Sequence, residues 1–117
     1  MKQKYYWGFG ILLLLILSLT IIFIQQNKTN WLNQLIEKEK NEPVANPPAS
    51  LTKCIYKNKI VYYLPPRCCD IQSVLYNKNG EFICAPDGGI SGVGDGRCPD
   101  FFEERKNCEI IWKDSRS

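Results

Sequence analysis

The stretch CCDIQSVLYNKNGEFICAPDGGISGVGDGRCPDFF, residues 68–102, decides how the folded part of this 117-residue chain is built. It holds four of the six cysteines and six of the eight glycines. Few of its residues could fill a large apolar core, and a region the size of residues 51–117 is only marginally stable on a single core. We therefore expect disulfide bonds to supply much of its stability.

Two hairpins and a final strand are predicted around this stretch. Residues 53–64, KCIYKNKIVYYL, contain two runs of strand formers around a turn at residues 57–59. Residues 73–85 repeat the pattern around Asn79-Gly80, a strong hairpin signal. The run CEIIWK, residues 108–113, could close the sheet against the first strand, which makes Cys54 and Cys108 a candidate pair.

The six cysteines are predicted to be structural. Their spacing contains no C-x-x-C, the pattern of zinc and thioredoxin-like sites. Because a bond between adjacent cysteines would strain the local backbone, we expect Cys68 and Cys69 to pair outward, with Cys84 and Cys98 in either combination. The predicted disulfide cysteines are Cys54, Cys68, Cys69, Cys84, Cys98 and Cys108.

The N-terminus predicts a membrane span. Residues 5–24 carry no charge and are long enough to cross the hydrocarbon core as a helix. Lys2 and Lys4 precede an aromatic cluster, which places the N-terminus in the cytoplasm. The alternative is a cleaved signal, but the run is long for one and ends without a small-x-small site. In either case the rest of the chain is exported to an oxidising compartment, where disulfides persist.

These patterns predict one N-terminal transmembrane helix followed by a small disulfide-rich, mainly β (α+β) domain. The expected parts are a cytoplasmic tail (1–4), a signal anchor (5–24), a juxtamembrane helix with a proline-rich linker (25–50) and an extracytoplasmic domain (51–117). Thr29 or Asn30 could cap the short helix, whose apolar stripe begins at Trp31. We expect that stripe to lie on headgroups or on the domain; the alternative is a partner-binding helix. Residues 42–50, EPVANPPAS, predict a stiff spacer or a strap on the domain surface.

Composition excludes several classes of function. The chain has no histidine, which removes Ser-His-Asp and Cys-His catalysis and the commonest zinc ligand. Beyond residue 50, ten lysines and arginines face nine acidic residues, so the domain lacks the basic excess of a nucleic-acid binder. We predict that the protein is not an enzyme and binds no nucleic acid.

The glycine–aspartate loop, residues 86–100, offers one candidate metal site. Asp87, Asp95 and Asp100 could converge on Ca²⁺ together with glycine carbonyls. The alternative, which we favour, is a chain of tight turns whose aspartates bond to their own backbone. No other cofactor is predicted.

Several segments carry a resemblance. The phrases NPPASL, IYKNKIVYYLPPRCCD, LYNKNGEFICAPDGGISGVGDGRCPDFF and IIWKDSR, within residues 46–116, resemble a family of small exported bacterial proteins of unknown function. The shared motifs are Tyr-Tyr-x-Pro-Pro-x-Cys-Cys-Asp and Pro-Asp-Gly-Gly…Gly-Asp-Gly-x-Cys-Pro-Asp-Phe. The family pattern lacks Cys54 and Cys108, which favours pairing these two with each other. The resemblance implies export and a fold unit but no activity.

The sequence thus predicts a single-pass protein of the bacterial inner membrane, with its C-terminal domain in the periplasm. The expected role is a non-catalytic interaction or accessory module with a protein partner in the envelope. Its predicted contact surface is the glycine–aspartate loop together with some of the aromatic residues Tyr62, Tyr63, Phe101, Phe102 and Trp112. The alternatives are a Ca²⁺-dependent binding domain and a protease inhibitor that presents Arg67.

Overall fold

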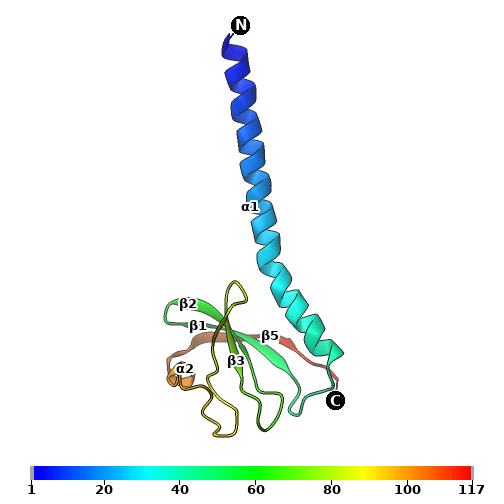
Figure 1. Ribbon diagram of the computed structural model, residues 1–117, viewed down its shortest axis with the longest axis vertical. Helices are drawn as coiled ribbons and strands as arrows, with labels where there is room; N and C mark the ends of the chain where they lie inside the picture. Colours follow the sequence, from blue (N-terminus) through cyan, green and yellow to red (C-terminus); the bar gives the residue numbers. More distant parts are fainter. Residues whose placement is uncertain (1, 117) are drawn as a thin grey trace.

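The chain folds into one long helix and a small five-stranded sheet (Figure 1). The computed structural model describes residues 2–116, apart from the side chains of Lys28 and Thr29. The elements are α1 (Lys2–Asn41), β1 (Ser50–Tyr56), β2 (Lys59–Leu64), β3 (Val74–Asn77), β4 (Phe82–Cys84), α2 (Phe101–Glu104) and β5 (Lys106–Lys113). The predicted fold class, an apolar N-terminal helix with a disulfide-rich β domain, is confirmed.

The sheet is antiparallel, with strand order β4-β3-β2-β1-β5. Both predicted hairpins form, and β5 pairs with β1 as expected. In the first turn Lys57 and Asn58 take positive φ values of 50° and 62°, a pair of left-handed residues that suits a two-residue hairpin. In the second, Gly80 has φ 82° and its amide donates to the Asn77 carbonyl at 3.1 Å.

The helix differs from the prediction of two separate helices. α1 runs without a break through Thr29 and Asn30, so neither residue caps a new helix. Between the apolar run and Asn41 the sequence has neither proline nor glycine, so nothing there interrupts the backbone hydrogen bonds. The helix is long and apolar enough to cross a membrane, and its most apolar window is not buried by the domain.

The core lies on one face of the sheet and is small. Phe101, from the four-residue α2, is fully buried and packs edge-on against Tyr56 with ring centroids 5.4 Å apart. Leu75 and Val61 are buried beside it, and the Cys84–Cys98 disulfide joins the same cluster. The Cys54–Cys108 disulfide ties β1 to β5, which confirms that predicted pair.

The stripe of α1 that begins at Trp31 packs on the other face of the sheet. The Trp31 ring lies 5.2 Å from Tyr62 and 5.6 Å from Tyr76, centroid to centroid, and its Nε1–H donates to the Lys78 carbonyl at 3.1 Å. Leu32, Leu35 and Ile36 are half-buried. The domain-packing prediction for this stripe is therefore correct.

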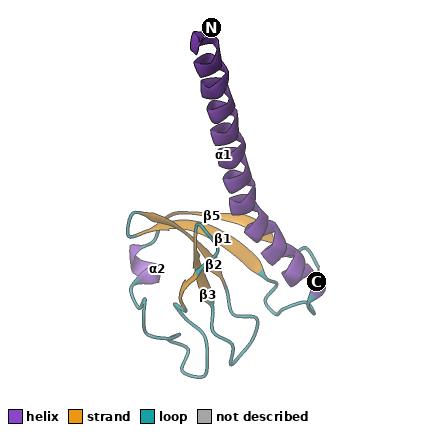
Figure 2. Cartoon of the chain, turned by 45° about the horizontal axis from the view of Figure 1, so that its top comes forward, coloured by secondary structure: helices purple, strands orange, loops and turns teal. Residues whose placement is uncertain are grey.

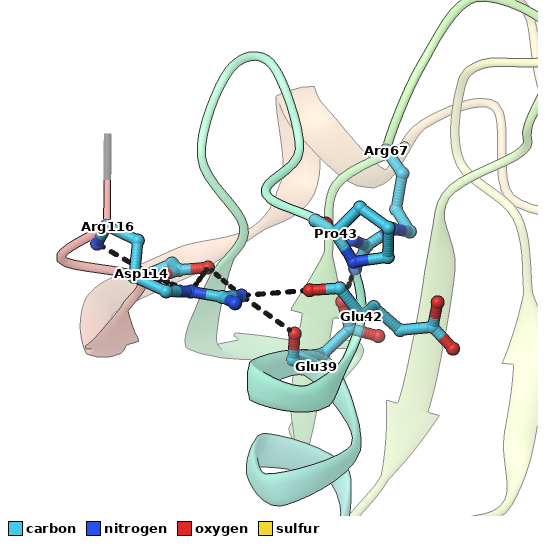
Figure 3. A network of polar contacts seen from close by, with 6 residues as sticks. All are labelled: Glu39, Glu42, Pro43, Arg67, Asp114 and Arg116. Carbon is cyan, nitrogen blue, oxygen red and sulfur yellow. Dashed lines mark hydrogen bonds and ion pairs between the residues drawn. The ribbon is translucent and has the colours of Figure 1, made fainter.

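Two arginines fix the end of α1 to the domain (Figure 3). The guanidinium of Arg116 donates to the carbonyls of Glu39 and Glu42, both at 3.2 Å, and to the Asp114 carboxylate at 2.8 Å. Arg67 donates to the Glu39 carboxylate and to the Pro43 carbonyl. Because the last carbonyls of a helix lack intrahelical partners and carry partial negative charge, the bond from Arg116 to the Glu39 carbonyl caps α1. We call these contacts the joint.

The joint also explains the path of the proline-rich linker and the state of Asp114. Ala45 and Ala49 are buried, and the Asp114 amide donates to the Ala49 carbonyl at 2.8 Å, so residues 42–50 form the predicted strap rather than a free spacer. The hydrogen bonds from Arg116 hold the pKa of Asp114 at about 2. This carboxylate therefore stays charged at neutral pH and keeps Arg116 in place.

Candidate functional site

The end of the domain opposite the start of α1 carries exposed apolar side chains. The loops 65–73 and 85–100 both point away from the N-terminal half of the helix (Figures 1 and 2). Ile90 is 94% exposed and Val93 is 67% exposed, while Ile71 is half-exposed on the neighbouring loop. We call these three residues, together with the exposed Cys68–Cys69 disulfide, the distal rim.

The backbone beneath the distal rim is held by many hydrogen bonds. Ser73 and Asp87 form three: the Ser73 amide and hydroxyl both donate to the Asp87 carbonyl, and the Asp87 amide donates to the Ser73 hydroxyl. The Gly89 amide donates to the Ile71 carbonyl at 3.1 Å, which joins the two loops. The apolar side chains are therefore presented on an ordered support rather than on a free loop.

The Asp87 side chain connects this support to the core. Its carboxylate accepts a hydrogen bond of 2.8 Å from the buried Tyr63 hydroxyl. Burial, and then the bond to Asp87, raise the pKa of Tyr63 well above the ordinary value for a phenol. The hydroxyl is thus a permanent donor at neutral pH and anchors the loop to β2.

Gly94 shows why this loop needs glycine. Its φ is 70°, and a Cβ added there would lie 1.9 Å from the carbonyl oxygen of Ala85. The Asp95 amide donates to the same Ala85 carbonyl at 3.0 Å. The loop therefore folds back so closely on the segment after β4 that no larger residue fits.

The structure does not bring together the three aspartates proposed for Ca²⁺. Asp87 is bound by Tyr63, Asp100 accepts a hydrogen bond from Tyr56, and Asp95 accepts one from the Arg97 amide two residues on. Among residues 2–116, no three acidic, cysteine or histidine side chains gather as a metal site would require. The loop is instead a series of turns, and we do not propose calcium for it.

The predicted outward pairing of Cys68 and Cys69 is wrong, because the two cysteines bond to each other. Cys84 and Cys98 both lie in the buried cluster and pair there. Cys68 and Cys69 lie in an exposed turn outside the sheet. Since the other four cysteines pair among themselves, each of these two can bond only to its neighbour. All six predicted cysteines are therefore in disulfides, but Cys68, Cys69, Cys84 and Cys98 are connected differently from either predicted combination.

Other expected surface residues are distributed differently. Phe101 is core, Tyr63 is buried, and Tyr62 is partly covered by Trp31, so the aromatic part of the predicted surface shrinks to Phe102 and part of Trp112. Arg67 belongs to the joint, where its guanidinium is already bound, so the geometry does not favour the inhibitor alternative.

The sequence interpretation found the glycine–aspartate loop but not the apolar side chains of the distal rim. The available signal was the placement of Ile90 and Val93 between turn-forming glycines, where neither can reach a core. No local sequence pattern indicated that Ile71 lies beside Gly89, because that contact joins two separate loops.

One protein-family model matches the chain. A domain of unknown function (DUF6970) covers residues 37–114. The match begins in the last turns of α1 and includes the sheet and the distal rim, but not the apolar part of the helix. No curated protein and no solved structure matches.

Proposed function

Since the chain belongs to the DUF6970 family of domains of unknown function, we propose a function from its own geometry: it is a membrane-anchored, non-catalytic binding module. On this proposal α1 crosses the bacterial cytoplasmic membrane with its N-terminus in the cytoplasm. The disulfide-bonded domain then lies in the periplasm and presents the distal rim to a protein partner in the envelope.

The orientation rests on charge and on thiol chemistry. Lys2 and Lys4 directly precede the apolar run, as expected for a cytoplasmic end. Disulfides form and persist where thiols are kept oxidised, and the far side of that membrane is such a compartment. Both arguments favour the same orientation.

The observation that carries the binding role is the distal rim. Exposed apolar side chains on a hydrogen-bonded support are a feature of protein interaction sites, since little entropy is lost when an ordered surface binds. The rim also lies at the end farthest from the start of α1, where a second envelope protein has free access (Figure 1). The non-catalytic role is supported by the lack of histidine, which removes the usual imidazole acid or base.

Site-specific photocrosslinking in intact cells tests this role. A benzophenone amino acid at Ile90 is compared with the same residue at Ile110, an isoleucine of β5 that is also well exposed. We expect a discrete crosslinked partner from position 90 and none from position 110. No adduct at position 90, or the same adducts at both, would contradict a binding role for the distal rim. Protease protection in right-side-out and inverted vesicles tests the orientation separately.

A further inference from the structure

A second surface lies at the opposite end of the domain, between the two hairpin turns. The β1–β2 turn and the β3–β4 turn enclose a groove of about 810 Å³, with Tyr56, Val61 and Ile83 on its walls. Its polar lining consists of three lysines and three asparagines and contains no acidic residue; these residues are Lys57, Asn58, Lys59, Asn77, Lys78 and Asn79. Ammonium and amide groups both donate hydrogen bonds, so the groove is suited to an anion.

Most of this positive charge is not neutralised within the domain. Lys57 lies 3.9 Å from the Asp100 carboxylate, at the limit of an ion pair. Within the described residues, Lys59 and Lys78 form no ion pair. Glu81, the acidic residue that follows the β3–β4 turn, is outside the lining. The groove therefore keeps an excess of positive charge.

The contact with Trp31 fixes where the groove lies along α1. Trp31 bonds to the Lys78 carbonyl and packs against Gly80, so the β3–β4 turn is held at this level of the helix. Trp31 follows Ile24, the last residue of the apolar run, by seven residues. At 1.5 Å per residue this is about 10 Å, and the headgroup layer beyond the hydrocarbon is itself roughly 5–8 Å thick.

The direction of the β3–β4 turn agrees with this estimate. In Figures 1 and 2 the β3–β4 turn points toward the N-terminal half of α1, whereas the loops of the distal rim point away. The Lys78 side chain on this turn would lie within about one Debye length, 8 Å, of the lipid phosphates. Ile55 and Ile60, directly paired across β1 and β2, add partly exposed apolar surface beside the β1–β2 turn.

We propose that the groove between the hairpin turns binds the phosphate of an anionic phospholipid in the membrane that α1 crosses. This rests on the membrane anchoring proposed above. The lysines supply the charge complementarity, and the asparagines hydrogen-bond to the phosphate oxygens. Binding holds the domain against the bilayer, so that the distal rim faces outward. Each basic residue near an anionic surface strengthens such binding by about fivefold.

Amide hydrogen exchange of the full chain in nanodiscs tests the proposal. Wild-type protein is compared in phosphatidylcholine alone and in phosphatidylcholine with phosphatidylglycerol. We expect exchange in the two turns, residues 57–59 and 77–80, to be slower by several-fold when phosphatidylglycerol is present. The Lys59→Gln/Lys78→Gln variant should lose this difference. The matched control Arg97→Gln/Lys113→Gln, which removes the same charge from exposed positions outside the groove, should keep it.

Two further arms separate the possible failures. Exchange that slows equally when inorganic phosphate is added to phosphatidylcholine nanodiscs would show a site for free anions and overturn the lipid assignment. If exchange does not depend on the lipid but the chain resists alkaline carbonate extraction, phospholipid binding by the groove is refuted. The proposed membrane anchoring by α1 then still stands. Release of the chain by carbonate would overturn both. If the control variant also loses the lipid effect, the effect depends on the overall surface charge and not on the groove. That result would refute the proposed phospholipid site.

Discussion

The three disulfides should differ greatly in their contribution to stability, because they close loops of very different length. Removing each disulfide in turn tests this in the full chain in detergent. The three double variants are Cys54→Ala/Cys108→Ala, Cys84→Ala/Cys98→Ala and Cys68→Ala/Cys69→Ala. Alanine introduces no new polar group at the buried positions.

The expected losses follow from the sequence separations of the paired cysteines. Closing the loop of the 54-residue separation is worth about 4 kcal/mol, and closing that of the 14-residue separation about 3 kcal/mol, by loop-closure entropy. A bond between neighbours closes almost no loop, so its removal should lower the free energy of unfolding by about 1 kcal/mol or less. Small cavities left by the buried cysteines can only widen the gap.

Guanidinium unfolding, followed by tryptophan fluorescence, measures the three losses. If Cys68→Ala/Cys69→Ala is as destabilising as either other variant, the reasoning fails. Connectivity has its own test in the single variant Cys68→Ala. Alkylation and peptide mapping should find the free thiol at Cys69; a free thiol at Cys84 or Cys98 would restore the outward pairing.

Three further predictions concern the loop, acid and alkali. Gly96→Ala should lower the free energy of unfolding by about 1 kcal/mol, because Gly96 has a left-handed backbone. Gly94→Ala should lower it several times as much, because the new Cβ would also meet the Ala85 carbonyl. Equal losses of the two variants in guanidinium unfolding would contradict this close approach. The pKa of Asp114 is about 2 in the folded chain and higher unfolded, so its stabilising effect should be lost as pH falls from about 4 to 2. Melting temperatures over that range should therefore fall less in Asp114→Asn. Because the pKa of Tyr63 is raised, its stabilising effect is present below pH 10 and is lost as pH rises beyond it. Tyr63→Phe should flatten the fall in melting temperature above pH 10, and an unchanged slope would show that this hydroxyl is not the titrating group.

Much of the sheet could be predicted because its signals are local. The left-handed turn at Asn58, the Asn79-Gly80 turn and the alternating strand formers each act over a few residues. The pairing of β5 with β1 could be predicted because residues 108–113 were the one strand left without a hairpin partner, and because Cys54 and Cys108 suggested a bond between these two strands. These features depend on backbone preferences that residues carry wherever they are placed.

The joint and the distal rim could not be predicted in the same way. Arg116 meets Glu39 across 77 positions, and Trp31 meets Lys78 across 47. Such contacts depend on where the whole helix comes to lie. The Cys68–Cys69 bond was missed for a related reason: the prediction weighed local geometry, whereas burial of the other two thiols decided the pairing.

The position of β5 in the sheet has a consequence for biosynthesis. β1 is the first strand of the sheet to be made, yet one of its two neighbours, β5, is the last. Until the ribosome has released residues 106–113, β1 has an open edge and Cys54 has no native partner. The domain therefore cannot finish folding until β5 has been made. Its closing strand and longest cross-link form only once the rest of the sheet has been made, and a chain cut short before β5 would present an unpaired strand to aggregation or proteolysis.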